Sequence, residues 1–416
     1  MQKGRMIRGM EWREGRATEL GSTDRVRALS RTFHKLRPSI CLHRARAYTH
    51  VYSNTEGEPA VLRRAKAFAY TLEILPPVIL DQELILGYPG CKPRSVTVKP
   101  EYHAAMLMEE IDCLDIREHD PYVITEREKR EYKKDLGPYW KGKTVYDFWN
   151  KRCPEEIQQK VIGTGYADCS NMVLGAVMGH HMCPPFEEIL RNGLLFFREE
   201  AEKNMEDLDI SDPDDAGKEH FYTAMMIICD AIDKYAGRHS DMLVELASKE
   251  KDPARAEELK KLSEICGRVP REPARNFHEA LQSFWFIQYL LHVEGTGPAI
   301  SPGRFDQFIY PYYRKDIESG RLTRESAQEL LECLWIKMTN VMWFNGEMDA
   351  YFFPGYVPFQ NLTVGGLNRD TGKDATNELS YLCIDALMET RTTQPTLSVI
   401  LHENSPEKFR LKVGDL

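Results

Sequence analysis

Three side chains that could bind a metal ion or transfer a proton stand together in Gly179-His180-His181-Met182-Cys183, directly before a Pro-Pro pair. Imidazole and thiolate groups are preferred ligands of zinc. The side chains of adjacent residues diverge, however, so two neighbouring histidines do not readily share one ion. The prolines put these groups at the mouth of an element rather than in its interior. We therefore expect one histidine here to point into a cavity, and we expect no metal site.

The other motifs that could carry chemistry are incomplete. "FHEAL" around His278 lacks the second histidine of a zinc-protease helix, so we expect a buried, hydrogen-bonded histidine. "GTGY" at 163–166 and "VGG" at 364–366 lack the spacing of a nucleotide-binding loop and are typical of turns. None of the ten cysteines forms a Cys-x-x-Cys pair, and their spacing indicates neither a zinc site nor a disulfide framework.

In the segment "AISPGRFDQFIYPYY" at 299–313, a Ser-Pro-Gly sequence that interrupts regular secondary structure is followed by charged residues. Its pattern predicts a helix start, with Ser301 as the N-cap and Pro302 in the first helical position. Arg304 and Asp306 would then form a local ion pair. This interpretation gives the two charges a structural role.

The composition is that of a globular protein with a large core. The 416 residues are 42% hydrophobic and 29% charged, with a net charge of -9. No basic face or tail is present, which argues against a nucleic-acid partner. The first residues, "MQKGRMIRGMEWREGR", lack the apolar core of a signal peptide, and no apolar run reaches membrane-spanning length. We expect a cytoplasmic protein that contacts no membrane.

The first two thirds of the chain predict mainly helices. Apolar residues recur at helical spacing in 55–76, 219–250 and 252–270, and the most apolar helix is expected within 272–297. The segment 76–90 predicts a short pair of strands around Asp81. The charged and aromatic region 99–160 indicates further helices joined by turns.

From about residue 320 the pattern alternates between helices and strands. Helices are predicted in 322–343 and in 374–391, the second capped by Asp374, and strands in 359–366 and 396–401. This order is typical of a parallel α/β architecture. Ser405-Pro406-Glu407 signals another helix, yet the sequence stops about two turns later, before further strands could cover the last one. We therefore expect a chain cut off inside its fold.

Several motifs together resemble the glycyl-radical enzymes of the pyruvate formate-lyase and glycerol dehydratase family, on the dehydratase-like side. They occur in family order from about Arg25 to the end of the chain. The motifs are "TEGEPAVLRRAKAF", "DQELILGY", "EPARNFHEALQSFWFIQYLLHVEG", "SPGRFDQFIYPYY", "QELLECLWIKM", "FQNLTVGG" and "TTQPTLSVIL".

The resemblance implies an α/β fold in which 1–416 is the N-terminal part of one large domain. Residues up to about 270 would be mainly helical, and 271–416 would begin the first half of a ten-stranded α/β barrel. A complete enzyme would carry a thiyl-forming cysteine in a Gly-Cys-x-Glu loop and a glycyl radical near its C-terminus. Neither motif occurs here, since Gly90-Cys91 is followed by Lys92-Pro93. We therefore expect no catalytic residue in this chain and no turnover from it alone.

The resemblance also implies the substrate-binding positions His180, Pro298 and Ala299. Diol dehydratases place a His-Ser pair where this sequence has Pro298-Ala299, so two hydrogen-bonding groups are missing here. The Pro184-Pro185 pair replaces an aspartate of the diol and choline enzymes. "PPFEEILRNGL" is similar to the arylalkylsuccinate synthases, and an apolar pocket would suit such a substrate or an aryl-acetate.

Implied partners are a small-molecule substrate and an activating enzyme that uses S-adenosylmethionine and an iron–sulfur cluster, and a homodimer is implied for the complete enzyme. No cofactor is expected to bind this chain directly. Two alternatives stay open: a non-catalytic half-protein that pairs with a separate C-terminal chain, and pyruvate formate-lyase itself.

Overall fold

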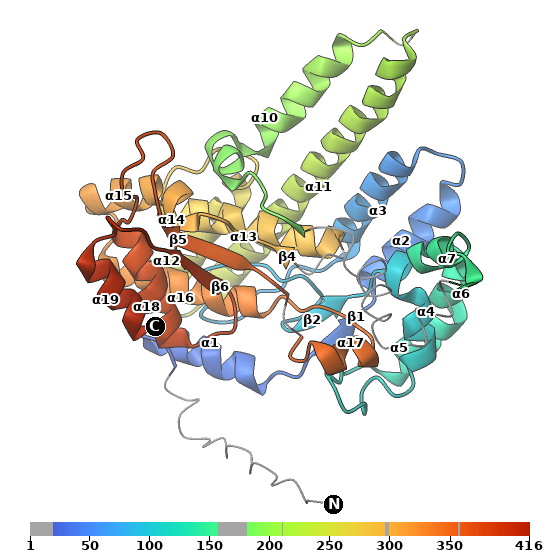
Figure 1. Ribbon diagram of the computed structural model, residues 1–416, viewed down its shortest axis with the longest axis horizontal. Coiled ribbons are helices and arrows are strands. Elements are labelled where there is room, and N and C mark those ends of the chain that lie inside the picture. Colours follow the sequence, from blue (N-terminus) through green and yellow to red (C-terminus); the bar gives the residue numbers. More distant parts are fainter. Residues whose placement is uncertain (1–19, 157–180, 210, 296–298, 357) are drawn as a thin grey trace, which may run out of the picture.

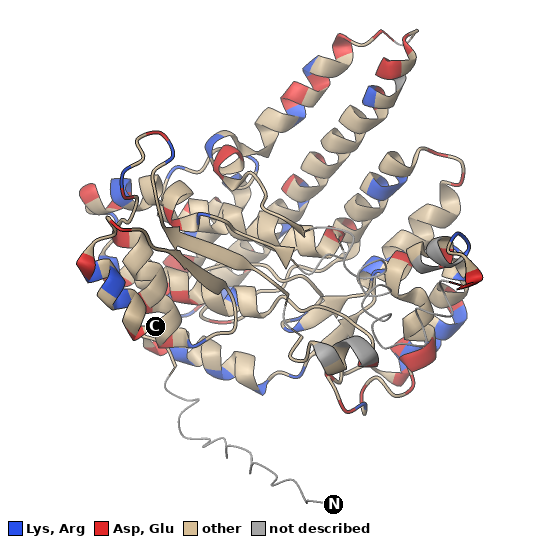
Figure 2. Cartoon of the chain, in the orientation of Figure 1, with Lys and Arg blue, Asp and Glu red and all other residues tan. Residues whose placement is uncertain are grey.

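The computed structural model describes residues 20–156, 181–209, 211–295, 299–356 and 358–416, and Figure 1 shows short strands surrounded by many helices. The strands near the C-terminal end carry no charged residues, whereas the outer helices carry charges of both signs (Figure 2). This distribution places the apolar core between the strands and the helices. None of the helices in the described part of the chain has the length and apolar character needed to cross a membrane.

Helix α13 (Phe277–Glu294) is the centre of the core, as its apolar sequence predicts. It begins at Asn276, whose side chain accepts a hydrogen bond from the backbone N–H of Glu279. Phe277, Phe284 and Trp285 are fully buried, and helix α16 (Arg324–Thr339) packs against α13 with its own buried Trp335. A helix that is apolar on all sides is stable only when neighbours surround it.

The predicted strand pair in 76–90 is wrong. This segment runs along α13, and side chains of that helix satisfy its backbone groups. The side chain of Gln282 accepts from Leu86 N–H at 2.8 Å and donates to Leu86 O at 2.9 Å. Trp285 donates to Gly87 O at 3.1 Å. The apolar residues therefore reach the core without a partner strand, because the Gln282 side chain satisfies the backbone groups that a neighbouring strand would otherwise bind.

The three small sheets in the described part of the chain are parallel pairs. β1 (Ser39–Cys41) pairs with β2 (Ser95–Thr97), β3 (His181–Met182) with β4 (Ala299–Ile300), and β5 (Asn361–Gly365) with β6 (Thr396–Ile400). Single bridges from Ala299 to Phe359 and from Gly303 to Leu362 connect β4 to the β5 segment. β3, β4, β5 and β6 thus follow one another side by side, and both predicted C-terminal strands are confirmed.

Helices α10 (Phe186–Glu206) and α11 (Pro213–Lys249) project together from the body of the molecule (Figure 1). The Arg198 guanidinium lies 2.8 Å from Asp230, which links the two helices. Near its start α10 is interrupted at Gly193, where φ is +73° and an added Cβ would lie 2.4 Å from Arg271 O. A side chain at this position would meet both backbone strain and a clash.

The other helices surround these elements. Their bounds are α1 (Asp24–Lys35), α2 (His43–Asn54), α3 (Ala60–Ile74), α4 (Pro100–Glu110), α5 (Glu126–Glu131), η1 (Tyr132–Leu136), α6 (Gly137–Trp140), α7 (Val145–Asn150), α12 (Pro253–Arg268), α14 (Phe305–Phe308), α15 (Tyr310–Glu318), α17 (Glu347–Phe352), α18 (Glu378–Thr390) and α19 (Glu407–Asp415). The helices predicted from periodicity in 55–76, 219–250, 252–270 and 322–343 are confirmed, and so is the helix start at Glu407.

Two predicted helix caps are wrong. α14 begins at Phe305, and no side chain caps it, so Ser301 is not an N-cap. α18 is capped by Asn377, which forms a reciprocal capping box with Ser380. Asp374 instead lies 3.0 Å from Nε2 of His402. In both cases the helix begins a few residues later than predicted, because irregular backbone follows Ser301 and Asp374.

Candidate functional site

The start of β4 and the start of β3 form the candidate site, because they bring together two of the segments that the sequence singled out. His181 pairs with Ala299, and Met182 pairs with Ile300. His181 is exposed, Ala299 is half-buried and Ile300 is buried. His180 and Pro298, the other predicted substrate-binding positions, lie outside the described residues.

The Ser-Pro-Gly turn after β4 fastens the neighbouring strands to one another. Ser301 N–H donates to Met182 O at 2.9 Å, and Gly303 N–H donates to Asn361 O at 3.3 Å. Gly303 has a φ of +70°, and an added Cβ would lie 2.5 Å from Sγ of Cys183. Glycine is therefore required where the turn passes the thiol. Met182 and Cys183 are thus in direct contact with the "SPGR" turn.

Arg304 and Asp306 hold the end of β5 rather than forming the predicted local pair. The guanidinium of Arg304 donates to Gly365 O at 2.8 Å and to Leu367 O at 2.7 Å. The carboxylate of Asp306 accepts from Gly365 N–H at 2.8 Å and from the Ser380 hydroxyl at 2.5 Å. Burial raises the pKa of Asp306. Both side chains are scaffold for the strand.

Three buried glutamines connect the strands from inside; we call Gln288, Gln360 and Gln394 the glutamine network. Gln288 Nε2 lies 2.8 Å from Ile300 O and 3.2 Å from Gln360 Oε1. Gln360 donates through Nε2 to Met338 O at 2.8 Å, and its backbone N–H donates to Gln394 Oε1 at 3.0 Å. The network ties β4, the β5 segment, the β6 segment and α16 together with neutral groups.

Of the two histidine predictions, the one for His278 is confirmed, whereas the one for the His180-His181 pair stays a prediction, because His181 is exposed and His180 lies outside the described residues. His278 is confirmed as a hydrogen-bonded histidine, with Nε2 2.7 Å from Leu84 O and a pKa lowered by burial. In the described part of the chain, neither His181 nor Cys183 belongs to a group of three metal-ligating side chains. Burial raises the pKa of the Cys183 thiol.

One group of three such side chains is present elsewhere among the described residues, namely Cys41, His43 and Cys91. The hydrogen bond from Cys41, together with His43 and Lys92, lowers the pKa of Cys91 to about 5. No spacing rule predicts this group, because 47 residues separate His43 from Cys91 in the chain. The glutamine network was also missed, although Gln360 and Gln394 lie in two of the motifs that carry the resemblance.

Parallel strands that are wrapped by helices and connected by buried glutamines form an α/β scaffold. The model of the "Pyruvate formate lyase-like" family matches residues 18–416. The chain therefore belongs to this family, that of the glycyl-radical enzymes, as its motifs predict.

Curated relatives include lyases and dehydratases. Isethionate sulfite-lyase of Oleidesulfovibrio alaskensis is 36% identical over 401 residues, covering 95% of this chain and 48% of that protein. Trans-4-hydroxy-L-proline dehydratase of Clostridioides difficile is 30% identical over 400 residues, covering 94% of this chain and 49% of that protein. The chain spans about half the length of the curated relatives it matches.

Solved structures have the same fold over almost all of the chain. One from a study of 1,2-propanediol dehydration in Roseburia inulinivorans superposes with a TM-score of 0.89 at 37% identity, covering 96% of this chain and 50% of that one. The glycerol-bound, B12-independent glycerol dehydratase of Clostridium butyricum gives a TM-score of 0.87 at 35% identity, covering 94% and 49%. The chain thus has the fold of glycyl-radical dehydratases over the part that it shares with them.

Proposed function

We propose that this chain is the N-terminal part of a glycyl-radical lyase that cleaves a C–C or C–X bond of a small organic substrate. The observation that carries the proposal is the family match over 18–416, together with the superposition on dehydratases over 96% of the chain. The relatives named as sulfite-lyase, dehydratase and decarboxylase all cleave such bonds. Radical addition to an alkene, as in an arylalkylsuccinate synthase, is a variant of the same chemistry.

In this proposal residues 271–416, which contain β4, β5 and β6, begin the first half of a ten-stranded barrel, and residues 1–270 are its mainly helical part. The run of β3, β4, β5 and β6 in one parallel order supports this assignment. The second half-barrel would supply the thiyl cysteine and the glycyl radical, since neither motif occurs here. A half-barrel cannot exclude water and oxygen from a radical, and so the chain alone is inactive.

His180, Pro298 and Ala299 bind the substrate in this proposal. Support comes from the pairing of His181 with Ala299, because these residues directly follow His180 and Pro298 in the chain. His180 would give one polar contact, while Pro298 and Ala299 would give an apolar wall without hydrogen-bonding side chains. The site would then favour a substrate that is apolar where glycerol carries a hydroxyl group.

The partners follow from the radical chemistry. A separate activating enzyme that uses S-adenosylmethionine and an iron–sulfur cluster would install the glycyl radical, and this chain would bind neither group itself. The complete enzyme would be a homodimer. The chain's own residues position the substrate, while the radical breaks the bond.

Anaerobic electron paramagnetic resonance tests the proposal. The chain is co-produced with a C-terminal half that bears a Gly-Cys-x-Glu loop and a glycyl loop, and the complex is treated with an activating enzyme. We expect a glycyl-radical doublet and turnover only from the assembled halves. Turnover by this chain alone would contradict the proposal, as would assembly and radical formation without turnover of any lyase or dehydratase substrate in a panel of sulfonates, diols, amino acids and aryl-acetates.

A further inference from the structure

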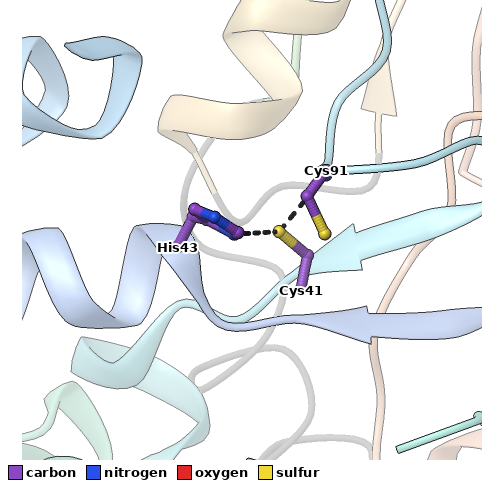
Figure 3. Close-up of side chains that lie close together, drawn as sticks. All are labelled: Cys41, His43 and Cys91. Carbon is purple, nitrogen blue, oxygen red and sulfur yellow. Dashed lines mark hydrogen bonds between the residues drawn. The ribbon is translucent and has the colours of Figure 1, made fainter. Parts of the chain in front are cut away.

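The side chains of Cys41, His43 and Cys91 point toward one another at the junction of β1, α2 and the loop before β2 (Figure 3). Cys41 is the last residue of β1, and His43 is the first residue of α2. Leu42 between them has helical backbone angles (φ -87°, ψ -1°), and across this turn Sγ of Cys41 lies 3.4 Å from Nδ1 of His43. Cys91 approaches that side from a segment far away in the sequence.

We propose that Cys41, His43 and Cys91 form a binding site for a thiophilic divalent cation of the zinc class. Sγ of both cysteines and a ring nitrogen of the histidine all lie within 4.8 Å of one another. None of these three residues is among the proposed substrate-binding positions, and the inference does not depend on the proposed function.

The distances fit a tetrahedral zinc site. Zinc lies about 2.3 Å from a thiolate sulfur and about 2.0–2.1 Å from an imidazole nitrogen, so these two ligand atoms are about 3.5 Å apart in a tetrahedral arrangement. Sγ of Cys41 and Nδ1 of His43 are 3.4 Å apart. The ion would need little movement of this pair. Two thiolates and a neutral imidazole also balance the charge of a divalent ion.

The surrounding backbone holds Cys91 in place. An added Cβ at Gly90 would lie 2.1 Å from Oγ of Ser95, so only glycine lets the loop approach β2 this closely. The Ser95 hydroxyl donates to Lys92 O at 2.7 Å and accepts from Lys92 N–H at 3.3 Å. Because Ser95 is the first residue of β2, the pairing of β2 with β1 fixes the loop relative to Cys41.

Cys41 already has the hydrogen bond that a ligating sulfur commonly receives. The backbone N–H of Cys91 donates to Sγ of Cys41 at 3.4 Å, and such bonds stabilise thiolate charge around a metal. Cys41 is fully buried, while His43 and Cys91 are half-buried. An ion would enter from the side of His43 and Cys91, and a water molecule would complete its coordination.

Titration of the full 416-residue chain with Co²⁺ under reducing, anaerobic conditions tests the site, followed by displacement with Zn²⁺. We expect one Co²⁺ per chain, with a near-ultraviolet thiolate-to-cobalt absorption that Zn²⁺ abolishes. Cys91→Ser and His43→Gln should each weaken Zn²⁺ binding by at least about tenfold, since the loss of a group that merely orients a ligand costs 10–100-fold. Circular dichroism in the presence of a chelator checks that both variants are folded.

The matched control is Cys113→Ser. Cys113 is also half-buried, but its thiol donates to Glu110 O at 3.3 Å, outside the cluster. This variant should bind Zn²⁺ as the wild type does. Equal affinity in Cys91→Ser, His43→Gln and Cys113→Ser would overturn the proposal, and so would the absence of a thiolate absorption in the wild type. A Cys41–Cys91 disulfide in the oxidised chain, combined with no Zn²⁺ binding after reduction, would assign the cluster to redox chemistry instead.

Discussion

Two buried polar networks start from consecutive residues of α16. Both hold neighbouring segments in the core, one through neutral groups and the other through charged groups. The glutamine network uses neutral amides and is anchored on the Met338 carbonyl. The second network is charged: the ammonium of Lys337 lies 2.5 Å from a carboxylate oxygen of Glu83, which also accepts the Tyr88 hydroxyl. Both Lys337 and Glu83 are almost completely buried.

The two networks hold different parts of the chain. The glutamine network joins strands that already pair through their backbones, so it adds to an existing connection. The charged network holds the segment 79–90, which has no strand partner; Lys337 also lies 3.4 Å from Gly87 O and 3.4 Å from the centre of the Tyr88 ring. A segment that forms no β-sheet hydrogen bonds depends on its side-chain contacts. Because those contacts include a buried ion pair, the loss of one partner should be strongly destabilising.

The largest effect is expected from Lys337→Met. Removal of the ammonium leaves the Glu83 carboxylate buried without its counter-charge, which costs about 3–5 kcal/mol. Urea unfolding of the chain measures the loss. The double variant with Glu83→Gln should recover part of the stability, because the unpaired charge is then also removed. A loss below about 1 kcal/mol for Lys337→Met would show that the pair does not hold the segment.

Acid should act on the charged region through His239 of α11, while burial lowers the pKa of His103 in α4 in the same direction. Burial first, and then the charge of Lys337, lowers the pKa of His239 from its ordinary 6.5 to about 4. A pKa that is lowered in the folded state gives stability that is present above the unfolded-state value and is lost as the pH falls from about 6.5 to about 4. At about 1.4 kcal/mol per pH unit, the loss is about 3 kcal/mol.

Unfolding measured from pH 7 to pH 4 checks this assignment. His239→Gln should reduce the slope of stability against pH across that window, whatever its effect on the stability at pH 7. His50→Gln is the control, because His50 is exposed on α2. An unchanged slope in His239→Gln would contradict the role given to His239.

A smaller loss is expected in the neutral network. Gln360→Leu removes the donor to Met338 O and the acceptor of Gln288 Nε2, while the backbone pairing of β5 with β6 stays intact. Leaving buried amide partners unsatisfied costs about 1–3 kcal/mol, to be read from urea unfolding beside Lys337→Met. If Gln360→Leu proved the more damaging of the two, the contrast between neutral and charged networks would be wrong.

The smallest effect on folding, but a specific effect on function, is expected for Ala299→Ser. Ala299 is half-buried at the start of β4, so a hydroxyl group there should change stability by less than about 0.5 kcal/mol. In the assembled enzyme one new hydrogen bond is worth about 1 kcal/mol, or about fivefold. The ratio of kcat/KM for a diol to that for an apolar substrate should rise by that factor. No change in the ratio would remove Ala299 from the substrate site.

Local sequence patterns predicted the elements that depend on local forces. The spacing of Phe277, Phe284 and Trp285 is sufficient to predict α13, because burial on all sides follows from its composition. Strand β6 and the helix start at Glu407 were predicted in the same way. The cap of α18 was misplaced because Asp374 and Asn377 are both good capping residues, and tertiary contacts decide between them.

Long-range side-chain contacts were beyond such reasoning. Nothing in "DQELILGY" shows that Gln282 would take the place of a strand beside Leu86, and nothing in the cysteine spacing brings Cys91 to Cys41. The candidate site was found through motifs that resemble a family rather than through spacing. Of its three residues, only Ala299 lies in the described part of the chain, where it pairs with His181 of β3, and its role in substrate binding stays a prediction.

The most direct test of the central claim is the nucleotide sequence of the coding frame beyond Leu416. We predict an open frame of about the same length again, with a Gly-Cys-x-Glu loop and a glycyl-radical loop near its end. A stop codon directly after Leu416, with no second gene that encodes those two motifs, would contradict the assignment of this chain to a working glycyl-radical lyase.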